Sequence, residues 1–246
     1  MKTPKMILFD YGHTLLYETD YNFLHGEEAL FDYVRSNKKE LTPKQVCDFS
    51  QKLFEQMGVV RDLGMEVHQW KFHKFLYEYL EVELTISPQE AERIFWNKIS
   101  MGGLMPNADK MIEFINKVGI RSGVISNISW SGNALTERID RLLPQNKFEF
   151  VITSSEYMFR KPNPMLFELA LKKAGLNSSD VWFCGDNIKA DVEGSAAVGI
   201  FPIWYDNKVI ENPLNQNGKE MAPKCEHLHI HDWVELIDVL KESGVR

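Results

Sequence analysis

Polar residues that can do chemistry follow apolar segments at four places in the chain. These are MILFD (6–10), ending in Asp10; SGVIS (122–126), ending in Ser126 and followed by Asn127; FEFVITS (148–154), followed by Lys161 in RKPNP; and VWFCGD (181–186), ending in Asp186 with Asp191 beyond it. Three carboxylates at one place repel each other unless a cation lies among them, and oxygen ligands suit Mg²⁺. An ammonium and a hydroxyl beside them suit a phosphate group, which a carboxylate next to a bound metal can attack. The residues therefore predict a Mg²⁺ site that handles a small phosphorylated molecule.

These side chains can cooperate only if the fold brings the ends of the four segments together. Segments this apolar are typical of strands buried on both faces of a parallel sheet, and a fifth one spans 201–206. Helix signals separate the later segments, with predicted N-caps at Asn107, Asn163 and Asp191 and predicted ends at Gly119, Gly175 and Gly199. A short strand at 227–230 and a helix at 233–243 complete the pattern. The alternation predicts a doubly wound α/β domain, whose strand ends share one crevice.

Residues 17–100 interrupt this alternation. The segment has no clear strand, and its apolar residues recur at helical spacing. Thr42 and Ser87 each begin a capping box with proline at the first helical position. We therefore expect a helical cap domain at 17–100, inserted into a core domain of 1–16 and 101–246. Because the insertion follows the first strand's carboxyl end, the cap is placed to act as a lid.

Composition narrows the class of protein. The chain of 246 residues has a net charge of −7, which disfavours a nucleic-acid partner. No apolar run is long enough for a membrane span or a signal peptide, and the three cysteines have no paired spacing. The sequence predicts a cytoplasmic enzyme without nucleic-acid or membrane partners, and it assigns no oligomeric state.

The four motifs, in this order, resemble those of the haloacid dehalogenase superfamily, whose members are mostly phosphatases. The resemblance covers the whole chain, including a helical cap after the first strand. It implies that Asp10 is the nucleophile and a Mg²⁺ ligand, with the Gly12 carbonyl, Asp186 and Asp191 as the other ligands. It further implies that Ser126, Asn127 and Lys161 hold the phosphoryl group.

The sequence departs from this family at Gly12, where its phosphatases usually carry a second aspartate. That aspartate protonates the leaving oxygen and then activates the hydrolytic water, a contribution of roughly 10²–10⁴-fold. His13 is the nearest titratable candidate to replace it. Three interpretations stay open: a phosphatase that favours good leaving groups, a 2-haloacid dehalogenase, or a low-turnover protein that binds a phosphometabolite or partner. Dehalogenases of the family also lack the second aspartate, but they need no metal and lack an acid at the position of Asp186. Phosphonate cleavage is disfavoured because no cap lysine can be assigned to it.

Two further groups of residues are candidates for binding. In the cap, side chains that are able to contact a substrate are Arg61, Glu66, His68, Trp70 and His73. Near the C-terminus, Cys225, His227, His229 and His231 recur at a spacing of two, so a strand would place them on one face. That face has the chemistry to bind a transition metal, although a solvated polar face with Leu228 and Ile230 toward the core explains the same pattern.

Overall fold

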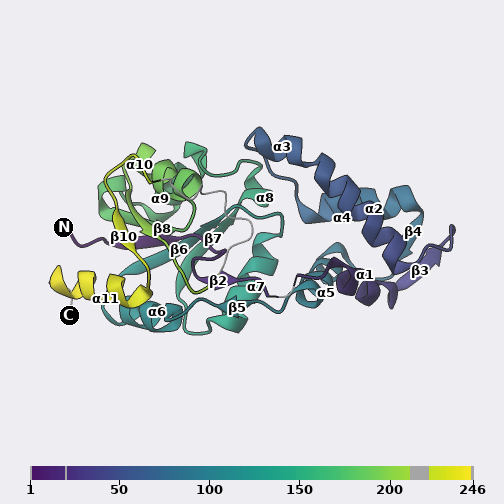
Figure 1. Cartoon of the computed structure of the whole chain (residues 1–246), viewed down its shortest axis with the longest axis horizontal. Coiled ribbons are helices and arrows are strands. Elements are labelled where there is room, and N and C mark those ends of the chain that lie inside the picture. The colour runs from purple at the N-terminus through teal and green to yellow at the C-terminus, as the bar shows by residue number, and fades with distance from the viewer. Residues whose placement is uncertain (1, 20, 211–221, 245–246) are drawn as a thin grey trace.

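The computed structural model describes residues 2–19, 21–210 and 222–244 and consists of two lobes (Figure 1). The larger lobe is built on a six-stranded parallel sheet with the order β10-β9-β8-β1-β6-β7. Its strands are β1 (Met6–Phe9), β6 (Arg121–Ser126), β7 (Phe148–Thr153), β8 (Val181–Gly185), β9 (Phe201–Tyr205) and β10 (Leu228–Ile230). The predicted α/β fold class is confirmed, and each predicted strand lies within one or two residues of its observed bounds.

Alternation along β1 shows why both faces of this sheet must be covered. Ile7 and Phe9 join the apolar cluster that includes α6 (Ala108–Lys117) and α11 (Trp233–Glu242). Met6 and Leu8 point to the opposite face and join a second cluster, which includes α9 (Pro164–Ala174). Since successive side chains of a strand point to opposite faces, a strand with no exposed residue needs helices on both sides. The remaining helical elements of this lobe are α7 (Gly132–Leu142), α8 (Ser154–Tyr157), η1 (Ser178–Asp180), η2 (Ile188–Glu193) and α10 (Gly194–Ala197).

The smaller lobe is mainly helical and follows β1 in the chain. Its elements are α1 (Phe23–Phe31), β3 (Val34–Asn37), α2 (Pro43–Gln56), α3 (Gly58–Asp62), α4 (Gln69–Leu80), β4 (Val82–Leu84) and α5 (Pro88–Ile99). Both predicted capping boxes are present, at the starts of α2 and α5. The expectation of a lobe without strands is wrong, because β3 and β4 form a short antiparallel pair. These strands are too short, at four and three residues, for the period of two to stand out in the sequence.

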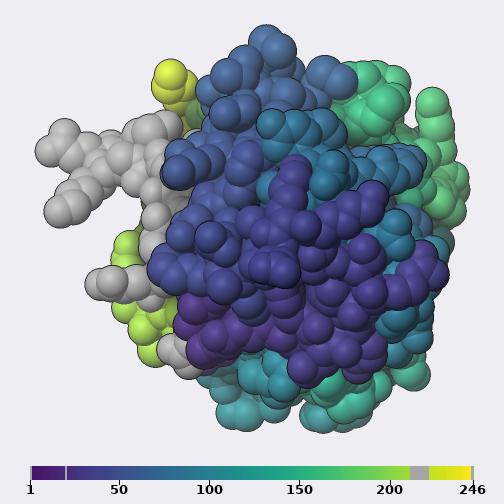
Figure 2. Space-filling view, turned by 90° about the vertical axis from the view of Figure 1, so that its right-hand side faces the viewer, coloured from purple at the N-terminus to yellow at the C-terminus, as the bar shows by residue number. Residues whose placement is uncertain are grey.

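The two lobes are joined where the chain leaves the core and where it returns. The outgoing segment β2 (Leu16–Tyr17) pairs antiparallel with the returning segment β5 (Gly103–Leu104). Both described ends of the chain lie at the far end of the core from the helical lobe (Figure 1). Viewed from the other end, the helical lobe fills the centre of the face and the core is visible around its rim (Figure 2). The predicted boundaries at 16/17 and 100/101 stay predictions, and they fall beside β2 and β5.

One predicted helix start is correct and one is wrong. Asn107 is the N-cap residue of α6, but its backbone is left-handed (φ 61°) and its side chain makes no capping hydrogen bond, donating to Asp232 at 2.9 Å instead. Asp191 does not begin a helix, since Asn187 is the N-cap and accepts from the Ala190 amide at 2.8 Å. No helix among the described residues is long and apolar enough to cross a membrane.

Candidate active site

The carboxylates of Asp10, Asp186 and Asp191 form a cluster at the carboxyl ends of β1 and β8. They can each offer one oxygen so that all three oxygens lie within 4.8 Å of one another. Asp10 is 8% exposed at the end of β1, and its amide donates to the Cys184 carbonyl at 2.8 Å. The neighbouring strand therefore fixes the backbone that carries the predicted nucleophile.

The Lys161 side chain contacts two of these carboxylates, those of Asp10 and Asp191. Its Nζ lies 2.6 Å from Asp10 Oδ1 and 2.7 Å from Asp191 Oδ1, and it donates to the Ile125 carbonyl at 2.8 Å. The side chain is 1% exposed. Burial by itself would lower the pKa of Lys161, but the charges of Asp10 and Asp191 outweigh it and raise this pKa. The ammonium is therefore held in its charged form beside the predicted nucleophile.

Asn127 holds the Lys161 backbone in place. Its Oδ1 accepts from the Lys161 amide at 2.7 Å, and its Nδ2 donates to the Lys161 carbonyl at 2.9 Å. Both ends of the amide side chain are thus used to position the lysine, and the role of Asn127 in phosphate binding stays a prediction. Ser126, at the end of β6, is 3% exposed.

Asp191 reaches the cluster because of a π-helical turn and a neighbouring glycine. The turn η2 places this carboxylate inward, and Asp191 Oδ2 accepts from the Asn187 amide at 3.0 Å. A Cβ atom on Gly185 would lie 2.4 Å from the Asp191 side chain, so only glycine fits there. Burial raises the pKa of Asp191 to about 6, while Lys161 acts in the opposite direction.

The charges in this site fit a divalent cation. Three carboxylates lie together here, and two of them share the Lys161 ammonium. Carboxylates this close repel each other, and a cation among them relieves that repulsion. Oxygen ligands of this kind suit Mg²⁺.

Gly12 lies in the turn after β1, in open space. A Cβ atom built there meets no atom within 4 Å, apart from its own chain neighbours. The next residue, His13, has a left-handed backbone (φ 53°), and its ring lies 6.5 Å from that of Tyr17. The His13 Nδ1 is buried without a hydrogen-bond partner among the described residues, and burial lowers the pKa of His13. His13 is therefore neutral at pH 7, and its role as an acid or base stays a prediction.

The five cap candidates lie in different surroundings. Glu66 is fully buried where the two lobes meet and pairs with Arg61 and Arg160. His68 caps α4 by accepting from the Trp70 amide at 3.1 Å, and the Trp70 indole donates to Glu92 at 2.7 Å. His73 is buried inside the helical lobe, with its Nε2 2.7 Å from the Gln69 amide nitrogen. The position of His73 removes it from the candidates for substrate contact.

Glu66 and Glu92 attach the helical lobe to the core. Ser154 donates to Glu66 at 3.0 Å, and Ser129 donates to it at 3.2 Å. Ser131 donates to Glu92 with both its amide, at 2.7 Å, and its hydroxyl, at 2.5 Å. These serines were not predicted, because no local pattern reveals partners 39 to 88 residues away in the chain.

Arg160 is a further residue of interest that the sequence did not single out, although it adjoins Lys161. Burial lowers the pKa of this guanidinium, and the charges of Glu66 and Asp10 act in the opposite direction. The arginine therefore lies within the electrostatic reach of both the lobe junction and the carboxylate cluster.

Comparison with known proteins identifies the family. Residues 7–205 match the family model for haloacid dehalogenase-like hydrolases, so the chain belongs to this family and is a hydrolase. The chain is 27% identical over 207 residues to glyceraldehyde 3-phosphate phosphatase of Pyrococcus abyssi, which covers 82% of this chain and 81% of that protein. It is 23% identical over 241 residues to ribulose-1,5-bisphosphate 5-phosphatase of Halopiger xanaduensis, which covers 95% and 98%.

A solved structure supports the fold. The crystal structure of 2-haloacid dehalogenase from Pseudomonas syringae pv. Tomato has a TM-score of 0.63 and 19% identity, covering 98% of this chain and 99% of that one. At this identity the likeness establishes the fold and does not choose between dehalogenase and phosphatase chemistry.

Proposed function

We propose that the protein is a Mg²⁺-dependent phosphatase for a small phosphorylated metabolite. The observation that carries this proposal is the cluster of Asp10, Asp186 and Asp191 with the Lys161 ammonium between two of them. The carboxylate at position 186 also argues against the dehalogenase alternative, whose chemistry needs no metal. Relatives named for phosphatase activity on glyceraldehyde 3-phosphate and ribulose 1,5-bisphosphate support a sugar phosphate as substrate.

In this proposal the three carboxylates and the Gly12 carbonyl hold Mg²⁺. When bound, Mg²⁺ neutralises charge on the phosphoryl oxygens and on Asp10. The Ser126 hydroxyl and the backbone amide of Asn127 donate to phosphoryl oxygens. The buried Lys161 ammonium, 2.6 Å from Asp10 Oδ1, fixes the orientation of the nucleophile.

Asp10 attacks phosphorus with its free carboxylate oxygen, and the bond from phosphorus to the ester oxygen breaks. This step leaves an aspartyl-phosphate on Asp10 and releases the alcohol, which takes a proton from water. Water then attacks the phosphorus of the aspartyl-phosphate, releasing inorganic phosphate and restoring the carboxylate. Without a side chain on Gly12, both proton transfers rely on water, so leaving groups of low pKa are preferred.

We also propose that the helical lobe, residues 17–100, is a cap that covers the crevice and selects the substrate. It follows β1 directly, and buried side chains of both lobes meet at Glu66 and Glu92. Arg61 and Arg160 lie at this junction, where a second anionic group of a substrate would compete with Glu66 for them.

Hydrolysis of p-nitrophenyl phosphate tests the proposal, measured with Mg²⁺ and with EDTA. We expect activity that requires Mg²⁺, is lost in Asp10→Asn and is retained in Asp238→Asn, a control on the exposed face of α11. Turnover that persists in EDTA together with release of halide from 2-haloacids would establish the dehalogenase alternative. Folded protein that binds phosphorylated sugars without turning over any phosphate ester would establish the binding-protein alternative.

A further inference from the structure

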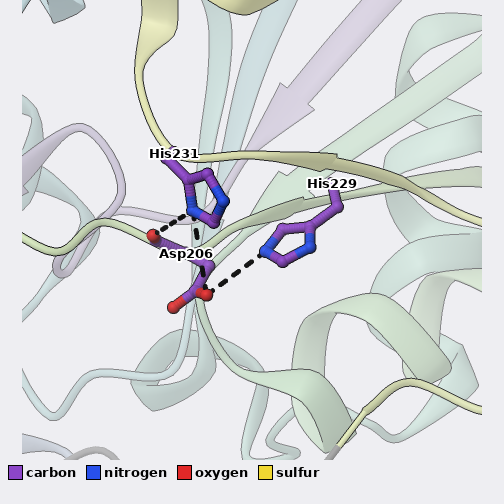
Figure 3. Close-up of side chains that lie close together, drawn as sticks. All are labelled: Asp206, His229 and His231. Atoms are coloured by element: carbon purple, nitrogen blue, oxygen red, sulfur yellow. Dashed lines mark hydrogen bonds and ion pairs between the residues drawn. The ribbon is translucent and has the colours of Figure 1, made fainter.

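A second cluster of potential metal ligands lies at the carboxyl edge of the same sheet, on β9 and β10. Asp206 follows β9, His229 lies within β10 and His231 follows β10 (Figure 3). The side chains converge on one carboxylate oxygen. His229 Nε2 is 3.2 Å from Asp206 Oδ2, and His231 Nδ1 is 3.8 Å from the same atom.

These separations are close to those of ligands around a transition metal. Ligands at 2.0–2.2 Å in a tetrahedral site lie roughly 3.4 Å apart. The three ligand atoms of this cluster lie within 4.8 Å of one another. A metal ion among them therefore needs only small rotations of side chains that are already in place.

Strand register explains why the cluster forms. Trp204 is the register partner of His229, and Tyr205 is the partner of Ile230, so Asp206 and His231 come next on the two chains. Residues two apart on a strand share a face, which places both histidines on one side. The His229 ring stacks on Trp204 with centroids 4.1 Å apart and an angle of 13°, which restricts its orientation.

Exposure leaves room for water to complete the coordination. The side chains of Asp206, His229 and His231 are 19%, 38% and 50% exposed. Three protein ligands with a remaining open position are typical of zinc sites that keep a water ligand. Cys225 and His227, which the sequence grouped with these histidines, are not part of the cluster; the His227 Nδ1 is 2.8 Å from the Cys225 carbonyl.

We propose that Asp206, His229 and His231 bind one divalent transition-metal ion, of which Zn²⁺ is the model. Imidazole nitrogens favour Zn²⁺, Ni²⁺ and Cu²⁺, whereas Mg²⁺ prefers oxygen ligands alone. The site is thus distinct in chemistry from the carboxylate cluster around Asp10. Its occupancy does not depend on the reaction that the enzyme catalyses.

Two contacts must give way when the ion binds. Lys208 Nζ lies 2.6 Å from Asp206 Oδ2, but its side chain is 69% exposed and free to turn into solvent. His231 Nδ1 lies 2.9 Å from the Asp206 carbonyl oxygen, so its ring must turn toward the carboxylate. Neither movement disturbs the core.

The ion would tie the ends of the two edge strands to the start of α11. Asp232 follows the last ligand and caps this helix by accepting from the Val234 amide at 2.7 Å. The next residue, Trp233, is fully buried and donates to the carbonyl of Thr14, in the loop after β1, at 3.1 Å. Metal binding therefore stabilises the C-terminal helix in its position against that loop.

Calorimetric titration of the untagged full chain with ZnCl₂ tests the proposal, with Mg²⁺ in large excess to occupy the carboxylate cluster. We expect one equivalent of Zn²⁺, and at least ~10-fold weaker binding in His229→Ala and in His231→Ala, since even changes beyond the ligands commonly cost that much. His25→Ala, at an exposed histidine of the helical lobe, is the matched control and should bind as the parent does. Thermal unfolding with and without Zn²⁺ gives a second measurement, because ligand binding to the folded state raises the unfolding temperature.

Absence of Zn²⁺ binding, or equal binding by the parent and both histidine variants, would overturn the proposal. Since titration and unfolding report no catalysis, these outcomes are separate from failure of the phosphatase proposal. Because protons compete with the metal for imidazole nitrogens, the affinity should also fall as the pH is lowered.

Discussion

The Gly12→Asp variant adds the aspartate that this chain lacks at position 12, and the structure indicates that the side chain fits. Apart from Gly12 itself and its two chain neighbours, no atom of the described residues lies within 4 Å of the added Cβ, and the backbone of Gly12 is not in the left-handed region. The substitution therefore tests proton transfer with little change in packing. The added charge is a cost, because it places a further carboxylate near the three of the cluster.

General acid catalysis contributes roughly 10²–10⁴-fold, which corresponds to about 3–5 kcal/mol in the barrier. An alkyl phosphate needs that proton, since an alkoxide is a poor leaving group, whereas p-nitrophenolate leaves without it. We therefore expect kcat/KM for glycerol 3-phosphate to rise by about 10²-fold or more in Gly12→Asp. The same ratio for p-nitrophenyl phosphate should change by less than about tenfold.

The assay compares the two substrates at saturating Mg²⁺, because kcat/KM reports the step in which the ester bond breaks. Gly12→Asn is the matched control, as it fills the same space without a carboxyl group. Equal gains for both substrates, or the same gain in Gly12→Asn, would refute the idea that Gly12 limits proton transfer to the leaving group.

Three further predictions concern packing and charge. Gly185→Ala should raise the Mg²⁺ concentration needed for half-maximal activity by at least ~10-fold, because its Cβ would lie 2.4 Å from the Asp191 side chain. Gly58→Ala is the control and should leave this concentration unchanged, because Gly58 lies in open space. Glu66→Gln should lower the free energy of unfolding by about 2–4 kcal/mol in urea, since it leaves two guanidiniums without their buried partner; a loss below 1 kcal/mol would contradict this. Burial raises the pKa of Glu27 from 4.5 to about 7, and the hydrogen bond from Tyr77 acts in the opposite direction. The protonated carboxyl therefore favours folding at low pH, and this contribution to the free energy of unfolding is lost as the pH rises from about 4.5 to 7. The difference in the free energy of unfolding between Glu27→Gln and the parent, measured in urea, should therefore change by about 3 kcal/mol in favour of the variant between pH 4 and pH 8. A difference that does not change with pH would contradict the raised pKa of Glu27.

The sequence predicted the sheet and its polar ends because these depend on local patterns. Each core strand is an apolar run that stops at a polar residue, as β1 stops before Asp10. What it could not predict depends on contacts distant in the chain. Glu66 meets Arg160 across 94 residues, and Asp206 meets His229 only because β10 adds to the sheet beside β9.

The errors have local physical causes. Asn107 and Asp191 have the residue types that cap helices, yet their side chains interact elsewhere, with Asp232 and with Lys161. A side chain with a stronger partner does not make the capping hydrogen bond, so residue type alone does not establish a cap.

The attachment of the helical lobe and the absence of a side chain on Gly12 both favour substrates whose leaving group departs without a proton. Glu66 and Glu92 are buried at the lobe junction and hydrogen-bonded to serines of the core, which limits the entry of water when the lobes are together. A phosphatase that relies on water for its proton is slowed by such closure, unless its leaving group departs without one. Acyl phosphates and phosphoanhydrides meet this condition, and a sugar phosphate meets it only if water enters with the substrate. Opening the junction with Glu66→Gln should therefore raise turnover of glycerol 3-phosphate relative to p-nitrophenyl phosphate, and a fall in that ratio would show that closure aids proton transfer instead.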